Sequence, residues 1–376
     1  MKKTAIVLYI ILLFPLLTGC WDQLPLRKLK MMDVAGLNLN ESGEVELHKV
    51  ESTLKTNGQG NGDVTTVITV AKGPSLLLAS GNSSYSSHVV YGVSNRLYLL
   101  SEKFALEYPT SEMSFLLTAP YSSINSPVVI FEGNLPKYMK DNSKKPKGFT
   151  DELNDYILTS EKRRMIQKVT MMDLLLSQEE ILEDLSIPVI RQSDNAIELD
   201  GAYLYSHGKN TGVKLSKDQV TMMMLLLGKH FVRLNLTGDL TEKNNEKKIS
   251  NHEKKSDYGF SVKEINSNFT VSRGSKELPT VTIKVRLKVY AYDLGTGIHL
   301  LSNTYINQKE KELSKHLEEM AKSTIESMQK ANSDAIGIGK EIKANHPNIW
   351  NLLSWSKDYP RISIQPKFEV EILNSN

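Results

Sequence analysis

The stretch Leu17-Thr18-Gly19-Cys20 constrains this chain more than any other feature of its sequence. A short positive region and an unbroken apolar run, Ala5 to Leu17, precede it, as in exported precursors. A leucine three places before a cysteine, with small residues between them, fits the subsites that process a bacterial lipoprotein precursor. We therefore expect cleavage after Gly19, with Leu17 and Gly19 flanking the cut, and S-diacylglyceryl and N-acyl groups on Cys20.

Two alternatives are a transmembrane anchor and an ordinary secretory signal in which Cys20 is incidental. Ala5 to Leu17 is 13 residues long, whereas a helix that spans the hydrocarbon needs about 20. Cys20 is the one cysteine of the chain, so the single thiol lies where acylation needs it. Because two or more fatty chains give stable anchoring, the sequence predicts a protein held on the outer face of a cell membrane.

Composition limits the remaining classes of function. Without residues 1–19 the chain keeps 357 residues, enough for two or three domains with cores of their own. The 46 Lys and Arg residues nearly balance the 43 Asp and Glu residues, so no positive field for nucleic acid is expected. An exported chain that can form no internal disulfide is typical of a Gram-positive type of host.

Hydrophobic periodicity predicts an α+β fold of several mixed α/β domains with antiparallel sheets. Apolar residues alternate from Val281 to Ala291 and from Ile362 to Ile372, which predicts two strands. Apolar residues at three- and four-residue steps from Lys309 to Ala331 predict one long amphipathic helix that packs on that sheet. Ser216 is expected to open a methionine-rich helix that Gly228 ends.

Four segments follow from this pattern. They are a signal peptide over 1–19, an N-terminal α+β domain over 20–195, a middle α+β domain over 196–245, and a C-terminal antiparallel sheet with one long helix over 256–376. Within the second segment, strands are expected at Met31–Leu39 and Val64–Val70, and Ser177 with Glu180 is expected to form a capping box. The lysine-rich stretch Thr241–Ser256 is expected to be a linker.

No motif in the sequence indicates catalysis. The eight histidines form no close ligand pair, so no metal site is expected. Gly337-Ile338-Gly339 lacks the last glycine of a dinucleotide fingerprint, and neither a P-loop nor a Gly-x-Ser-x-Gly elbow occurs, so we expect no cofactor and no enzyme. Four acidic residues are interpreted as a solvated helix face: Glu179, Glu180, Glu183 and Asp184.

Three parts of the chain carry a resemblance to a known family. They are Cys20-Trp21-Asp22, the strand Gly201-Ala202-Tyr203-Leu204 leading into residues 208–212, and a C-terminal signature of Ser333-Asp334-Ala335-Ile336-Gly337-Ile338-Gly339, Pro347-Asn348-Ile349-Trp350 and Trp355. With these segments the chain resembles the C subunits of spore nutrient germinant receptors. The resemblance implies a lipoprotein of three mixed α/β domains at the spore inner membrane, required for germination beside two polytopic partner subunits.

The signature residues also have physical roles that do not depend on the family. They are Asp334, Gly337, Gly339, Pro347, Trp350 and Trp355. Asp334 is expected to cap the helix that follows it, and the glycines permit close packing. The two tryptophans are expected to seal the core against the closing strand. The functional alternative is that one tryptophan belongs to a surface on which a partner docks.

The leading hypothesis is a non-catalytic, lipid-anchored receptor subunit that docks on membrane subunits. One alternative is the solute-binding lipoprotein of an ABC transporter, which should have two similar α/β lobes and a hinge. Another is an envelope hydrolase, which would need a convergent catalytic pocket. The sequence leaves open whether this subunit binds a small molecule itself.

Overall fold

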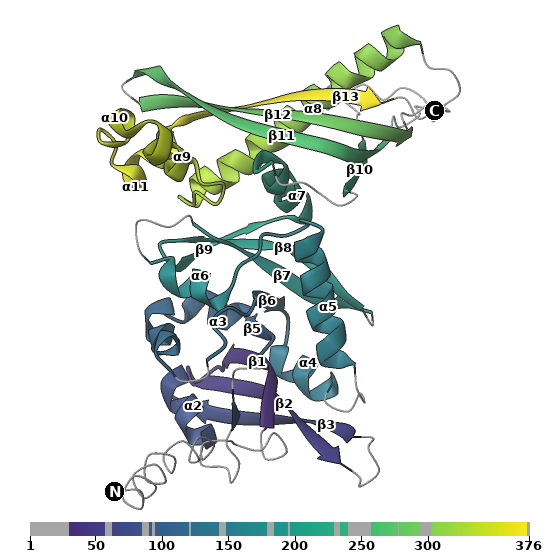
Figure 1. The fold of residues 1–376 in the computed structure, drawn as a ribbon. Helices are drawn as coiled ribbons and strands as arrows, with labels where there is room; N and C mark the ends of the chain where they lie inside the picture. Colours follow the sequence, from purple (N-terminus) through teal and green to yellow (C-terminus); the bar gives the residue numbers. More distant parts are fainter. Residues whose placement is uncertain are drawn as a thin grey trace, which may run out of the picture.

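The strands of the protein form two separate sheets (Figure 1). The computed structural model describes residues 30–373, except for 57–61, 85–89, 92–94, 120–121, 143–147, 179–183, 195, 229–233, 240–256, 277 and 294–301. The first sheet uses residues up to 215, and the second uses residues from 234 onward. The predicted α+β fold class is confirmed.

The first sheet contains nine strands. They are β1 (Lys30–Leu39), β2 (Val45–Thr56), β3 (Gly62–Gly73), β4 (Val90–Tyr91), β5 (Leu97–Ser101), β6 (Val128–Glu132), β7 (Ser186–Ser193), β8 (Ala196–Ser206) and β9 (Lys209–Leu215). Their order is β3-β2-β1-β5-β6-β7-β8-β9, with β4 beside the start of β1. The middle strands β1, β5, β6 and β7 run parallel, and the outer strands pair antiparallel. The predicted strands Met31–Leu39 and Val64–Val70 are confirmed as β1 and β3.

Helices cover both faces of the first sheet. They are α2 (Leu76–Ser84), α3 (Glu102–Glu107), the 3-10 helix η4 (Thr110–Leu117), α4 (Leu135–Asn142), α5 (Phe149–Lys162) and α6 (Met171–Leu176). One core lies beneath α2, α3, η4 and α6, and a second lies beneath α4 and α5. All five residues of β5 are therefore buried, as expected for a central parallel strand.

A capping box opens α6. Thr170 accepts from the Asp173 amide, and the Asp173 carboxylate accepts from the Thr170 amide, so this pair opens α6. Ser177 follows the last turn of α6, and its hydroxyl donates to the Leu174 carbonyl at 2.6 Å. The predicted capping box of Ser177 with Glu180 stays a prediction. Glu180 lies outside the described residues.

The second sheet has four strands and is packed by α8 (Asn303–Lys330), the predicted long helix. Its strands are β10 (Leu234–Asp239), β11 (Asp257–Lys276), β12 (Leu278–Asp293) and β13 (Ser363–Leu373), in that order across the sheet. The predicted antiparallel arrangement holds for β10, β11 and β12, but β13 runs parallel to β12. The helix α8 lies between these two strands in the chain, and such a crossover permits parallel pairing.

Short helices connect α8 to β13. They are α9 (Ile338–Asn345), α10 (Pro347–Trp350), α11 (Trp355–Asp358) and the 3-10 turn η5 (Tyr359–Arg361).

The helix α8 also closes the outer edge of β13. Three successive outward amides of β13 donate to α8 side chains: Phe368 to Glu318 at 2.9 Å, Val370 to Ser314 at 3.1 Å, and Ile372 to Glu310 at 2.8 Å.

Residues 196–245 are divided between the two sheets. β8 and β9 continue the first sheet, whereas α7 (Lys217–Leu226) packs in the core of the second, and β10 is the edge strand of that sheet. Ser216 opens α7 with a capping box and Gly228 follows it at φ 64°, as predicted. Within the described residues this segment has no sheet of its own, and the division into domains stays a prediction. The expected linker at Thr241–Ser256 lies outside the described residues.

Candidate functional site

The predicted lipidation residues lie outside the described part of the chain. Leu17, Gly19 and Cys20 precede residue 30, where the description begins. No helix of the described residues is both long and apolar enough to cross a membrane. The structure therefore bears on the signature segment and on what surrounds it.

Asp334 caps α9 in the way that the sequence predicts. Its carboxylate accepts from the amide of Ile338 at 2.9 Å and from the amide of Gly339 at 2.6 Å. These amides belong to the first turn of α9, where no intrahelical acceptor is available. The helix itself begins one residue after Gly337, which has φ 73° and so adopts a backbone conformation that favours glycine.

Gly339 lies against the aromatic cluster at this end of the second sheet. A Cβ atom at Gly339 would lie 2.6 Å from the ring of Trp355. The Trp355 ring lies 5.4 Å from the Trp350 ring and 5.3 Å from the Tyr359 ring, between their centroids. Close approach of the backbone to Trp355 is thus the physical reason for glycine at position 339.

The two tryptophans, Trp350 and Trp355, differ in their neighbouring residues. Trp355 packs between Gly339 and the fully buried Tyr359, consistent with the predicted sealing role. Trp350 is half-buried, carries the ammonium of Lys343 over its ring at 5.7 Å, and is two residues from Leu352, which is 82% exposed. Pro347 is the first residue of α10. A docking role for Trp350 stays a prediction.

Asp184 joins the signature segment to the first sheet. It lies just before β7, and its carboxylate accepts from the amide of Asp334 at 2.8 Å and from the amide of His207 at 3.1 Å. Burial raises the pKa of Asp184, and the two amides oppose that shift without cancelling it. One carboxylate thus holds the β8–β9 turn and the start of the signature together.

Further hydrogen bonds connect the same two regions. The Ser333 hydroxyl donates to the Tyr205 carbonyl at 2.7 Å, and the Ser206 hydroxyl donates to the Asn332 carbonyl at 2.7 Å. The Tyr359 hydroxyl donates to the Ser333 carbonyl at 3.0 Å, and burial raises its pKa well above the usual value. We call the set Asp184, Tyr205, Ser206, His207, Asn332, Ser333 and Asp334 the junction.

The junction was not predicted from the sequence, although some of its residues were named as candidates. Asp184 was interpreted as part of a solvated helix face, but it accepts two main-chain amides between the sheets. That interpretation is wrong for Asp184. The spacing of acidic residues in the sequence does not reveal that the amides of His207 and Asp334 lie next to its carboxylate in the folded chain. The other three acids of that set lie outside the described residues. A signal existed in the family segments, since the strand from Gly201 ends at this junction and the signature begins there with Ser333.

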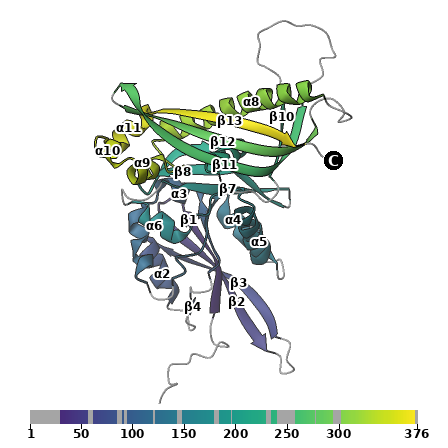
Figure 2. The same ribbon diagram turned by 45° about the horizontal axis from the view of Figure 1, so that its top comes forward.

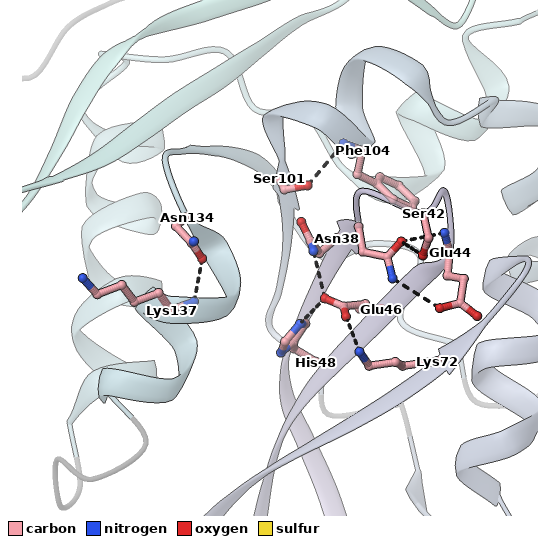
Figure 3. Close-up of polar contacts among 11 residues, drawn as sticks. Asn38, Ser42, Glu44, Glu46, His48, Lys72, Ser101, Phe104, Asn134 and Lys137 are labelled. Atoms are coloured by element: carbon pink, nitrogen blue, oxygen red, sulfur yellow. Dashed lines mark hydrogen bonds and ion pairs between the residues drawn. The ribbon is translucent and has the colours of Figure 1, made fainter.

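A second polar cluster lies at the carboxyl end of the parallel strands (Figure 3). Glu46 of β2 accepts from Asn38 at 2.9 Å and pairs with Lys72 of β3 at 2.6 Å. Burial alone would raise the pKa of Glu46, but the contacts with Lys72 and Asn38 outweigh it and lower the pKa. Burial lowers the pKa of His48, whose Nε2 lies 3.6 Å from Glu46.

Polar side chains around this second cluster cap the helices that follow β5 and β6. The Ser101 hydroxyl accepts from the Phe104 amide at the start of α3, and the Asn134 side chain accepts from the Lys137 amide at the start of α4 (Figure 3). Each helix start thus has its own cap, and Glu46 has its own cation. Among the described residues, no group of three or more His, Cys, Asp or Glu side chains is placed to hold a metal ion.

Comparison with known proteins covers both halves of the chain. A family model described as "Spore germination protein N-terminal domain" matches residues 22–192, and one described as "Spore germination B3/ GerAC like, C-terminal" matches residues 200–376. The solved structure titled "Crystal Structure of the GerBC protein" is similar at a TM-score of 0.56 and 15% identity, over 90% of this chain and 97% of that chain. No curated protein sequence matches the chain.

These findings define a spore germination protein. Since the two models together cover almost all of the chain after residue 21, the chain belongs to the GerAC-like family, the C subunits of spore germinant receptors. The resemblance that the sequence analysis identified is confirmed. The likeness to GerBC, at 15% identity, shows a common fold.

Proposed function

We propose that this protein is the lipid-anchored, non-catalytic subunit of a nutrient germinant receptor and is required for spore germination. Membership of the GerAC-like family carries this proposal. The stretch Leu17-Thr18-Gly19-Cys20 supports the anchoring step, because an acylated Cys20 would hold a folded body on the outer face of the spore inner membrane. Two polytopic subunits would be its partners there.

The junction supports a role in which the body acts as one piece. Its hydrogen bonds link the β8–β9 turn of the first sheet to the segment between α8 and α9 of the second. Such bonds would hold the two sheets in a fixed arrangement when the protein docks on its partners. Anchoring also raises the local concentration of the body beside its partners, which favours docking without a large interface.

The alternative of a solute-binding lipoprotein has less support. Such a protein should have two similar lobes, whereas the two sheets here differ in strand number, order and direction. The similarity to GerBC extends across both sheets. The receptor subunit is therefore the proposed function.

A Cys20→Ala variant tests the anchoring step. We expect this variant to leave the inner-membrane fraction of spores and to lose nutrient-triggered germination, with Ser42→Ala on an exposed turn as a matched control. Co-purification of the wild-type protein from spore inner membranes should bring down two multi-span proteins. Normal fractionation and normal germination of the Cys20→Ala variant would refute lipid anchoring as the basis of the function.

A further inference from the structure

The outer edge of β3 is open in the described residues. β3 is the first strand of its sheet and is paired along its whole length with β2, from Gly62 to Gly73, without a bulge. The side-chain amide of Asn82 in α2 donates to the Lys72 carbonyl at 2.9 Å, near the end of the strand. Over residues 66–71 no described residue outside β2 hydrogen-bonds to the backbone of β3.

The described side chains of β3, over residues 66–71, do not protect that edge. Val67 and Val70 are each 49% exposed. Residues 64–71 carry no charge and no proline, and most are β-branched. Natural sheets usually protect an edge with charged residues, proline or a bulge, because unpaired backbone groups recruit another strand. A regular, uncharged edge of this length is therefore a surface suited to strand addition.

We propose that β3 pairs antiparallel with β3 of a second copy of this chain, about a two-fold axis at Val67. The sequence of residues 64–70 is V-T-T-V-I-T-V, which is close to a palindrome centred on that residue. Pairing about this centre places residue 64 opposite residue 70, residue 65 opposite residue 69, residue 66 opposite residue 68, and Val67 opposite itself. These are Val–Val, Thr–Thr, Thr–Ile and Val–Val pairs, all between β-branched residues of the types that favour sheets.

Charge and shape also favour a second copy as the occupant. Asp63 precedes the uncharged run and Lys72 follows it, so antiparallel self-pairing brings the acidic end of one strand near the basic end of the other. A two-fold interface presents the same surface from both subunits, which a palindromic strand satisfies. Figure 2 shows the far ends of β2 and β3 extending away from the helices of the first sheet.

Cysteine cross-linking tests the register directly. Cys20 is the one native cysteine and would be acylated, so Val67→Cys introduces one free thiol per chain. Paired residues on antiparallel strands have Cα atoms about 4.5 to 5.5 Å apart, within the span of a disulfide. Val70→Cys is the matched control because its exposure equals that of Val67. In the proposed register its thiols would be about 20 Å apart.

We expect the full-length lipidated Val67→Cys variant, oxidised in detergent, to form cross-linked dimers several-fold more than the Val70→Cys variant. Light scattering of the native chain should give a dimer, and Val67→Lys should convert it to a monomer with an unchanged circular dichroism spectrum. Equal cross-linking of the two cysteine variants would overturn the register. A monomeric native chain at all concentrations, or a cross-link from Val67→Cys to a different protein, would overturn the second copy as the occupant.

Discussion

Two edge strands of similar length, β13 and β3, are treated in opposite ways. In β13 three successive outward amides donate to Glu318, Ser314 and Glu310 of α8, so the edge of the second sheet is closed. In β3 the described residues 66–71 have hydrogen-bonded partners only in β2. Along β13, exposed acidic residues alternate with apolar ones, as at Glu369 and Glu371. By contrast, β3 is uncharged over residues 64–71.

This difference determines whether a further strand can pair with each edge. The rise per residue of a strand is about twice that of a helix. A helix along a strand edge can therefore place one acceptor on every fourth residue opposite every second amide of the strand. The second sheet is therefore closed at β13 by its own chain. Within the described residues the first sheet is not closed at β3, so this strand is a place where backbone pairing can continue.

Removal of the α8 acceptors should have the largest effect. The variant Glu310→Ala, Ser314→Ala and Glu318→Ala leaves three β13 amides without partners, and we expect a loss of about 3 kcal/mol in the free energy of unfolding. The measurement is urea unfolding followed by tryptophan fluorescence. The control replaces three exposed residues of the same helix, Lys311, Lys315 and Glu319, by alanine. Equal stability of both variants would mean that α8 does not close this edge.

Gly339→Ala should disturb the end of the second sheet next to β13. The new Cβ atom would lie 2.6 Å from the Trp355 ring, so the ring or α9 must shift. We expect a loss of about 2 kcal/mol, with a changed near-ultraviolet spectrum from the displaced tryptophan. Gly81→Ala, where a Cβ atom meets open space, is the control. An unaltered spectrum would contradict the packing that we describe.

Asp184→Asn should weaken the junction in a pH-dependent way. Burial raises the folded-state pKa of Asp184 above its value in the unfolded chain, so ionisation costs more in the folded protein. The stabilising contribution is complete below the unfolded-state pKa and is lost as the pH rises through the folded-state pKa. We therefore expect a cost of about 1 kcal/mol near pH 4 that shrinks toward pH 7.

Urea unfolding of both proteins across that pH range measures this difference. Asp155→Asn, on the exposed side of α5, serves as the control for general charge effects. A stability difference that grows with rising pH would contradict the expected direction.

Val67→Lys should have the smallest effect on the stability of one chain. Because Val67 is half-exposed on an open edge, we expect a change within about 0.5 kcal/mol when unfolding is measured under dilute, monomeric conditions. A loss several times larger would mean that another part of the chain covers β3. This variant therefore sharpens the contrast with β13, where loss of edge contacts is expected to be costly.

Local periodicity predicted β12, α8 and β13 of the second sheet, but it did not predict β11. The alternation around Val285 and the three- and four-residue steps around Leu317 identified β12 and α8, because one face of each is buried in the same core. The direction of β13 was not predicted correctly. Alternation reports which face is buried but does not distinguish a parallel neighbour from an antiparallel one.

The candidate site was predicted only in part. The role of Asp334 as a helix cap follows from local spacing, and its two bonds to α9 bear this out. The link from Asp184 to Asp334 joins residues 150 positions apart. No local pattern encodes such a contact, because it depends on where two separate turns meet in the folded chain.

Hydrogen exchange of backbone amides tests the contrast between the two edges most directly. At low protein concentration we predict slow exchange at Phe368, Val370 and Ile372 of β13 and fast exchange at the outward amides of residues 66–71. At high concentration the β3 amides alone should become protected, as the second copy pairs with them. Equal protection of both strands at every concentration would contradict the account.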